Sequence, residues 1–304
     1  MTKKLKDVGA SVRSRLLELS KTRGDDFQLV LVRYVNERLL FRIASSPHAK
    51  TFILKGAALF TVWTGKPHRA TRDLDLLGSG DASEDHVIEV FLEILDRPVE
   101  DDGVSFDRAS LVASPIREDQ EYGGVRLTLA AHVAAAKVRV QVDIGFGDAV
   151  TPAARAIDFP SLLEFPAPRL RAYPRETVVA EKVEAMVKLG LANTRMKDFY
   201  DLRVMSHLFA FEGALLVKAL RATFTRRGTP FPNGAPPALT PAFFDDKSRR
   251  EQWAAFAKKT GARDAGELED AIDRVAGFCS QPLLVAAEES DWAGTWKPGG
   301  PWRR

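Results

Sequence analysis

The chain has 304 residues, 45% hydrophobic and 28% charged, and this composition is typical of a soluble globular protein with two lobes. No apolar run is long enough to cross a membrane, and the first residues lack the apolar core of a signal peptide, so we expect a cytoplasmic protein. The net charge of +3 is too small to indicate nucleic-acid binding by itself. The single cysteine, Cys279, excludes an internal disulfide framework and a zinc site built from cysteines, and we expect it to pack in the core.

The first half of the chain alternates between helical and strand patterns. Helices are predicted over residues 11–24, 25–46 and 83–98, and the last of them starts with Ser83 as its N-cap. A short strand that turns into a helix is predicted over residues 51–65. Strands are predicted over residues 68–80, 122–133 and 135–150, and the last two are expected to pair as a hairpin.

A Pro-rich segment over residues 158–176 contains the expected boundary between two lobes, 1–165 and 166–304. The second lobe is predicted to be mainly helical, with helices over residues 174–190, 194–211 and 242–261. The tail over residues 293–304 is expected to be a loop with frayed ends.

Two carboxylates stand out in the strand predicted over residues 68–80. Period-two alternation places Asp73 and Asp75 on one face, about 7 Å apart along the strand, and leucines on the other. Such a pair repels itself and loses solvation when it is half-buried, so something must compensate it. Asp143, on the polar side of another alternating strand, would add a third carboxylate if the two strands were neighbours.

Three interpretations of the pair remain open. A calcium loop of the EF-hand type is disfavoured, because Leu77 takes a position that needs an oxygen ligand and a strand pattern precedes the loop. The pair could be surface charge on a solvated edge strand. It could also bind one or two divalent ions such as Mg²⁺, which prefers oxygen ligands and would neutralise the pair.

Lys55 and Gly56 form a turn at the start of a predicted helix. Free backbone N–H groups and the helix dipole attract phosphates at such a place. An ordinary strand-to-helix turn is the alternative interpretation.

Lys182 is unexpected in the helix over residues 174–190, because it falls in the middle of an apolar arc. The arc comprises Val178, Val179, Val183, Ala185, Met186 and Leu189, and the opposite, polar side comprises Glu181, Glu184 and Lys188. In the next helix Asp198 falls inside an apolar arc and Asp201 lies near its edge; the arc comprises Leu202, Met205, Leu208 and Phe209.

Lys182 and Asp198 are either a structural ion pair or groups that face a cleft between the lobes. We expect the cleft, with Lys182 available to a triphosphate, because the carboxylates of the first lobe need a cationic, phosphate-bearing partner. Replacing Lys182 by Met would then cost less than about 1 kcal/mol of stability. In a buried pair the same change would cost about 3–5 kcal/mol.

Taken together, four motifs resemble the AbiEii-type nucleotidyltransferase toxins of bacterial abortive-infection systems. This family includes the mycobacterial MenT toxins and belongs to the DNA-polymerase-β-like nucleotidyltransferase superfamily. The motifs, between Lys55 and Leu202, are K-G-A, R-A-T-R-D-L-D-L, E-K and K-D-F-Y-D-L. One departure is Ala57, where the family commonly has a second glycine.

The resemblance implies an α+β fold, with a nucleotidyltransferase-like mixed sheet flanked by helices and a mainly helical C-terminal lobe that completes the active-site cleft. It implies that Asp73 and Asp75 are the metal-binding pair and Asp143 the third carboxylate. Lys182 matches the lysine that would contact the triphosphate, and Asp198 matches a residue that family members need for activity. Arg69 and Thr71 lead into the pair and are expected near phosphate.

The implied activity is Mg²⁺- or Mn²⁺-dependent transfer of a nucleotide from a nucleoside triphosphate to an RNA acceptor, with a tRNA 3′ end as the expected acceptor and an antitoxin encoded nearby. A small-molecule adenylyltransferase and a non-catalytic ion-binding protein are the alternatives. Several arginines could form a basic track for RNA, although such charges usually mark a solvated face. They are Arg169, Arg171, Arg175, Arg226, Arg227, Arg249 and Arg250.

Overall fold

The computed structural model describes residues 7–116, 123–262 and 264–303. The chain divides into two compact units, the first made of residues 1–147 and 155–172 and the second of residues 148–154 and 173–304. The boundary predicted at residue 165 falls before a strand that belongs to the first unit. Within the described residues, no helix combines the length and the apolar character that a membrane span requires.

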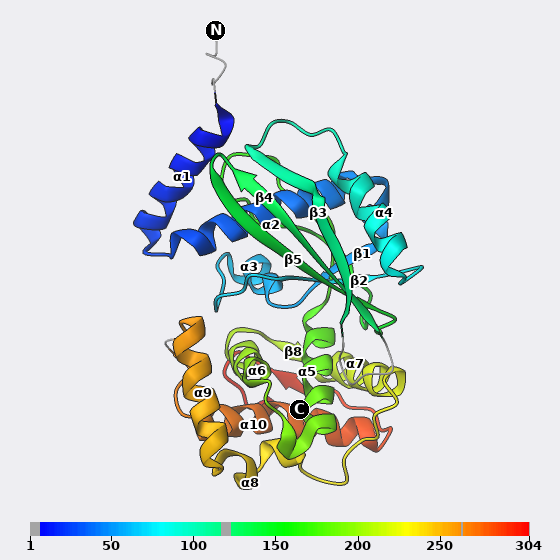
Figure 1. Cartoon of the computed structure of the whole chain (residues 1–304). Coiled ribbons are helices and arrows are strands. Elements are labelled where there is room, and N and C mark those ends of the chain that lie inside the picture. The colour runs from blue at the N-terminus through cyan, green and yellow to red at the C-terminus, as the bar shows by residue number, and fades with distance from the viewer. Residues whose placement is uncertain (1–6, 117–122, 263, 304) are drawn as a thin grey trace. The chain divides into compact units, whose positions relative to one another are not determined.

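The first unit is built around a mixed seven-stranded sheet (Figure 1). Its strands are β1 (Phe52–Lys55), β2 (Leu74–Gly78), β3 (Val104–Ile116), β4 (Gly124–Val133), β5 (Ala136–Phe146), β6 (Arg155–Asp158) and β7 (Arg169–Ala172). They lie in the order β3-β4-β5-β2-β1-β7-β6, with β2 parallel to β5 and β1 parallel to β7. The helices are α1 (Val8–Arg23), α2 (Phe27–Ser45), α3 (Ala58–Thr64) and α4 (Glu84–Leu95), and a 3₁₀ turn covers Pro47–Lys50.

Apart from Ala130, strands β4 and β5 alternate between buried apolar residues and partly or fully exposed, mostly polar ones. Their apolar residues, such as Val140 and Val142, are fully buried, and α1, α2 and α4 pack against strands β3 to β5. The polar residues occupy the other face. The hairpin and the three helices predicted in this half are confirmed, and Asp7 and Asp26 cap the first two helices through their side chains.

The strand predicted over residues 68–80 is wrong at its start. Strand β2 begins only at Leu74, and residues 68–73 form a loop, so Asp73 directly precedes the strand. The physical reason is the short neighbour: β1 ends at Lys55, opposite Asp75, and the chain then turns away at Gly56. On that side, residues before Leu74 therefore have no ladder with which to pair.

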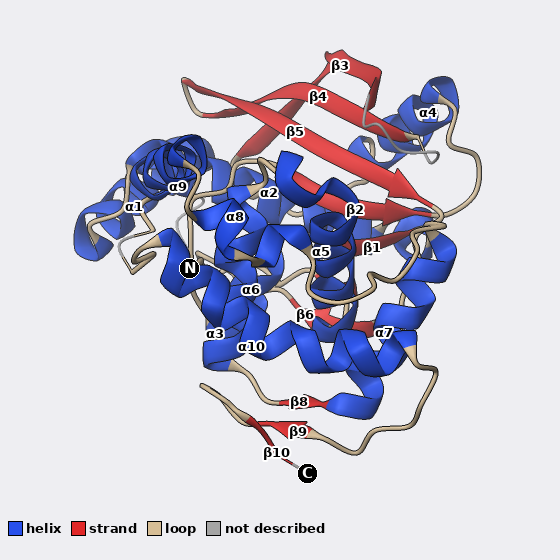
Figure 2. Ribbon diagram, turned by 90° about the horizontal axis from the view of Figure 1, so that it is seen from below, coloured by secondary structure: helices blue, strands red, loops and turns tan. Residues whose placement is uncertain are grey.

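The second unit is mainly helical, with a small antiparallel sheet in the order β10-β9-β8 (Figure 2). Its helices are α5 (Arg175–Leu189), α6 (Met196–Leu208), α7 (Gly213–Arg226), α8 (Pro241–Phe244), α9 (Lys247–Thr260) and α10 (Leu268–Ala287), with 3₁₀ turns at Gly190–Ala192 and Pro237–Leu239. The strands are β8 (Phe211–Glu212), β9 (Thr295–Trp296) and β10 (Trp302–Arg303). The single helix predicted over residues 242–261 is two helices, because Asp246 caps a new helix with its side chain.

The frayed tail that we expected is also wrong. Trp296 is buried, and its indole N–H donates to the carbonyl of Ser206 at 2.7 Å. The indole of Trp302 donates to the carbonyl of Phe278 at 2.8 Å, and its ring stacks on the Phe278 ring. The tail therefore belongs to the core of the second unit. Cys279 is buried in the same region, as expected.

Candidate active site

Four charged residues lie in a row across the middle of the seven-stranded sheet. Lys55 on β1 is opposite Asp75 on β2, Asp75 is opposite Asp143 on β5, and Asp143 is opposite Arg126 on β4. Residues directly opposite one another on neighbouring strands share a face. The row, here called the charge ladder, therefore runs cation, anion, anion, cation along the polar face. It places Lys55 beside Asp75, one member of the carboxylate pair whose repulsion needed an explanation, and Arg126 beside Asp143.

Strand β2 lies between β5 and β1, so the solvated edge strand is wrong as an explanation of the Asp pair. The calcium loop is wrong as well. Leu77 is buried within β2, and the segment runs from strand to loop to helix. The neighbourhood of β2 and β5, on which the third carboxylate depended, is confirmed by the Asp75–Asp143 pairing.

Arg126 holds the carboxylate of Asp143 at both oxygens. Its Nε donates to Oδ1 at 2.8 Å and its Nη2 to Oδ2 at 2.7 Å, and Gln141 adds a contact at 3.3 Å. The side chains are 41% exposed for Arg126 and 20% exposed for Asp143, so the pair is half in solvent. The sequence reasoning missed Arg126, although extending the predicted hairpin by its register would have placed it opposite Asp143.

Gly56 is required by the position of Asp75. Its φ of +75° is one that residues with a side chain rarely adopt, and a Cβ at this position would overlap the Asp75 carboxylate. The turn that we singled out for phosphate therefore also allows the backbone to approach a carboxylate closely. Helix α3 starts beyond it at Ala58, with Ala57 at the N-cap and no side-chain cap bond.

Asp73, Arg69 and Thr71 lie on the loop that precedes β2, and Asp73 is exposed. The side-chain amide of Asn36, on α2, donates to the carbonyl of Arg72 at 3.0 Å and ties this loop down. We expected Asp73 to lie on the strand beside Asp75, and this is wrong: Asp73 directly precedes β2 and lies in the loop.

The types of residue at this site suit a divalent ion. Their present positions suit an ion less well. Asp73, Asp75 and Asp143 supply the carboxylate oxygens that Mg²⁺ prefers, and two of them are in register on adjacent strands. Among the described residues, however, no group of three or more His, Cys, Asp or Glu is placed to hold a metal ion. Arg126 donates to both oxygens of Asp143, so an ion at this carboxylate would either share those oxygens with the arginine or displace it.

The second unit brings Lys182 and Asp198 together. Lys182 Nζ lies 2.6 Å from Asp198 Oδ1 and 2.9 Å from Asp201 Oδ2, and Arg195 Nε donates to the other Asp198 oxygen at 2.7 Å. Both aspartates are buried and Lys182 is 13% exposed. Burial alone raises the pKa of Asp198, but the charges of Lys182 and Arg195 overcome it and lower that pKa to about 2.

This geometry is the structural ion pair that we weighed against an available lysine. We expected Lys182→Met to change stability little because Lys182 would face a cleft. That premise is wrong, because Lys182 has two buried carboxylate partners.

The polar side assigned to α5 is only partly correct. Glu184 is fully buried and accepts from Arg227 Nη1 at 2.8 Å, because α7 packs along α5 and Arg227 follows α7. Arg227 also donates to Asp148 at 2.9 Å, so it is a structural residue and no part of a surface track. At the ends of the predicted apolar arcs, Leu189 and Leu208 are exposed.

Two solved structures are similar to this chain. MenT4, a nucleotidyltransferase toxin of Mycobacterium tuberculosis, matches with a TM-score of 0.50 at 17% identity, over 92% of this chain and 98% of that one. JHP933 of Helicobacter pylori matches with a TM-score of 0.49 at 12% identity, over 87% and 94% of the two chains. No curated protein matches the sequence.

The fold, α+β with a mixed sheet flanked by helices, is that of a nucleotidyltransferase, and the chain is an enzyme of this class. The model of the AbiEii family, "Nucleotidyl transferase AbiEii toxin, Type IV TA system", matches residues 38–279. The chain therefore belongs to the AbiEii nucleotidyltransferase toxins of type IV toxin–antitoxin systems, as the resemblance implied.

Proposed function

We propose that this toxin transfers a nucleotide from a nucleoside triphosphate to an RNA acceptor, the 3′ end of a tRNA, in a reaction that depends on Mg²⁺ or Mn²⁺. The observation that carries the proposal is the charge ladder, because two carboxylates in register on neighbouring central strands are positioned for a reaction at a phosphate. A cytoplasmic location and a cognate antitoxin encoded nearby belong to the same proposal.

In this proposal Asp73 and Asp75 hold the divalent ion, and Asp143 joins them once Arg126 has moved. When bound, the ion polarises the α-phosphate and stabilises the pyrophosphate that leaves. Asp143 accepts the proton of the attacking RNA hydroxyl through one of the oxygens that Arg126 now holds. The released guanidinium is then free to contact a phosphate oxygen.

The remaining roles rest on the motifs. Lys55, Gly56, Arg69 and Thr71 bind the phosphates of the triphosphate, with the backbone at Gly56 close to Asp75. Lys182 contributes positive charge to the triphosphate, and Asp198 sets the position of Lys182 through its 2.6 Å contact.

The test is incubation of the purified protein with each radiolabelled triphosphate, Mg²⁺ and either total tRNA or an aminoglycoside, followed by separation of the acceptor. Label in tRNA that is lost in Asp75→Asn supports the proposal. Label that appears in an aminoglycoside and not in RNA would show a small-molecule adenylyltransferase instead. A protein that labels neither acceptor would contradict the proposed reaction.

A further inference from the structure

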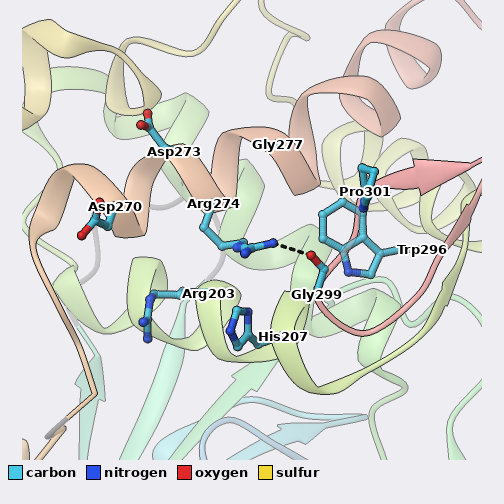
Figure 3. Close-up of a pocket in the computed structure, with 9 residues that line it drawn as sticks. All are labelled: Arg203, His207, Asp270, Asp273, Arg274, Gly277, Trp296, Gly299 and Pro301. Atoms are coloured by element: carbon cyan, nitrogen blue, oxygen red, sulfur yellow. Dashed lines mark hydrogen bonds between the residues drawn. The ribbon is translucent and has the colours of Figure 1, made fainter.

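The second unit contains a cavity of about 530 Å³ that the proposed reaction does not use (Figure 3). It lies between α6, α10 and the tail around β9 and β10. Its walls are formed by Arg203, His207, Asp270, Asp273, Arg274, Gly277, Trp296, Gly299 and Pro301.

Three cationic or protonatable side chains meet in this cavity. Arg203 and His207 are four residues apart on α6 and so share one face of the helix, and Arg274 reaches toward them from α10 (Figure 3). Arg274 Nη1 donates to the carbonyl of Gly299 at 2.6 Å, which leaves its other donors available to a ligand. Arg203 lies 4.0 Å from Asp264, a carboxylate that is itself 72% exposed.

Of the two acidic residues of the wall, Asp273 is turned away from this group, whereas Asp270 lies four residues before Arg274 and so shares its face of α10. In Figure 3 the carboxylate of Asp273 points to the far side of α10, opposite to the side chain of Arg274. Burial first, and then the charges of Arg274 and Arg203, lower the pKa of His207. Asp264 opposes this shift, and the positive charge that an anion in the cavity would meet is that of Arg203 and Arg274.

The residues that line the cavity favour a phosphate over a nucleotide base as the ligand. The Trp296 ring is buried against the core, so it offers no free face on which a base could stack. Gly277 faces open space, and a Cβ there would meet no atom. Two guanidinium groups and an imidazole N–H match the oxygens of a phosphate, which accept hydrogen bonds in several directions.

We propose that the cavity binds a backbone phosphate of the acceptor RNA and so helps to hold the acceptor on the helical unit. This inference rests on the proposed function, since it takes the acceptor to be RNA. A phosphate contact holds RNA of any sequence, so the cavity contributes affinity and position without reading bases.

The first experiment measures binding of labelled total tRNA at several salt concentrations, without triphosphate. We expect the double variant Arg203→Gln/His207→Gln to bind about tenfold more weakly and to lower the salt dependence by about one released counterion. Lys258→Gln, which removes an exposed charge from α9 outside the cavity, is the matched control and should bind like the wild type.

A second variant avoids any loss of existing contacts. Gly277→Glu adds a negative charge at the open wall and should weaken tRNA binding at least as strongly, while Gly277→Ala should not. All variants should bind the triphosphate with Mg²⁺ as the wild type does and should unfold at the same denaturant concentration or a higher one. In the transfer reaction the cavity variants should raise the KM for tRNA and leave kcat unchanged.

The outcomes separate the two proposals. A wild-type protein that labels tRNA, with cavity variants that bind tRNA equally well, overturns the cavity inference alone. A wild-type protein that neither binds nor labels tRNA overturns both. Weaker binding by the double variant and by Gly277→Glu, but not by Lys258→Gln or Gly277→Ala, establishes the cavity as a phosphate site.

Discussion

The charge ladder of the first unit and the Lys182–Asp198 cluster of the second use the same kinds of residue in opposite surroundings. In the ladder, Arg126 and Asp143 pair on the open polar face of a sheet, with 41% and 20% of their side chains exposed. In the cluster, both aspartates are buried and Lys182 is almost so. Exposed pairs exchange partners at little cost, whereas breaking a buried pair strands a charge. The ladder is therefore suited to binding and releasing ligands, whereas in the cluster the two buried aspartates hold Lys182 in one position.

The largest expected effect is on catalysis in the ladder. Asp73→Asn and Asp75→Asn should each abolish transfer, because an amide cannot replace a carboxylate in binding a divalent ion. In Mg²⁺-free buffer both variants should melt at or above the wild-type temperature, since the repulsion between carboxylates is relieved. Radiolabel transfer and thermal melts check this prediction. Full activity in either variant would exclude that residue from the reaction.

The next effect is on stability in the cluster. Lys182→Met should destabilise the protein by about 3–5 kcal/mol, because Asp198 and Asp201 lose their shared cation. Lys188→Met, on an exposed position of the same helix, is the control and should change stability by less than about 0.5 kcal/mol. Chemical denaturation measures both. A Lys182→Met protein as stable as the control would show that the buried pair is not structural.

Acid should weaken the cluster. The pKa of Asp198 is lowered to about 2 in the folded protein, below the ordinary value of 3.8, so its contribution is present above about pH 4 and is lost as the pH falls toward 2. This contribution is about 2 kcal/mol, and Asp198→Asn should remove it and flatten the acid limb of the stability curve. Denaturation midpoints between pH 5 and pH 2.5 test this; an unchanged acid limb in the variant would contradict it.

The smallest effect is expected at Arg126. Arg126→Gln should cost less than about 1 kcal/mol of stability, because the pair with Asp143 is half-exposed. It should also tighten Mn²⁺ binding several-fold, since Asp143 no longer needs to be released. Binding of Mn²⁺ without any nucleotide, followed by its electron spin resonance signal, measures this, and Arg139→Gln on the exposed side of β5 is the control. Weaker Mn²⁺ binding in Arg126→Gln would show that the arginine supports the ion site.

Sequence patterns predicted the helices and strands in which apolar residues recur at regular spacing. The spacing of apolar residues located α2 and α4, and alternation located β4 and β5, which made Asp143 a candidate before its strand was known to lie beside β2. Strands of four residues, such as β6 and β7, are too short to show a clear alternation of apolar and polar residues. They are stabilised by pairing with neighbouring strands. Strand β3 was missed because a register irregularity between Asp107 and Val112 interrupts its alternation.

Long-range partners explain the errors in the second unit. Glu184 looked solvated by its position on the helix, but its partner Arg227 lies 43 residues further along the chain. The charged pair of Lys182 and Asp198 was identified as one of two alternatives, and only the geometry separates them. Helical periodicity shows that a charged side chain points inward and needs a partner. It does not identify the residue that serves as this partner.

The ordered tail has a practical consequence for anyone who prepares shorter forms of this toxin. The family match ends at residue 279, yet Trp296 and Trp302 beyond it cover Phe278 and donate to carbonyls of the helical unit. Cutting the chain at the limit of the match would expose an aromatic cluster to water and remove one wall of the cavity. Such a fragment should aggregate.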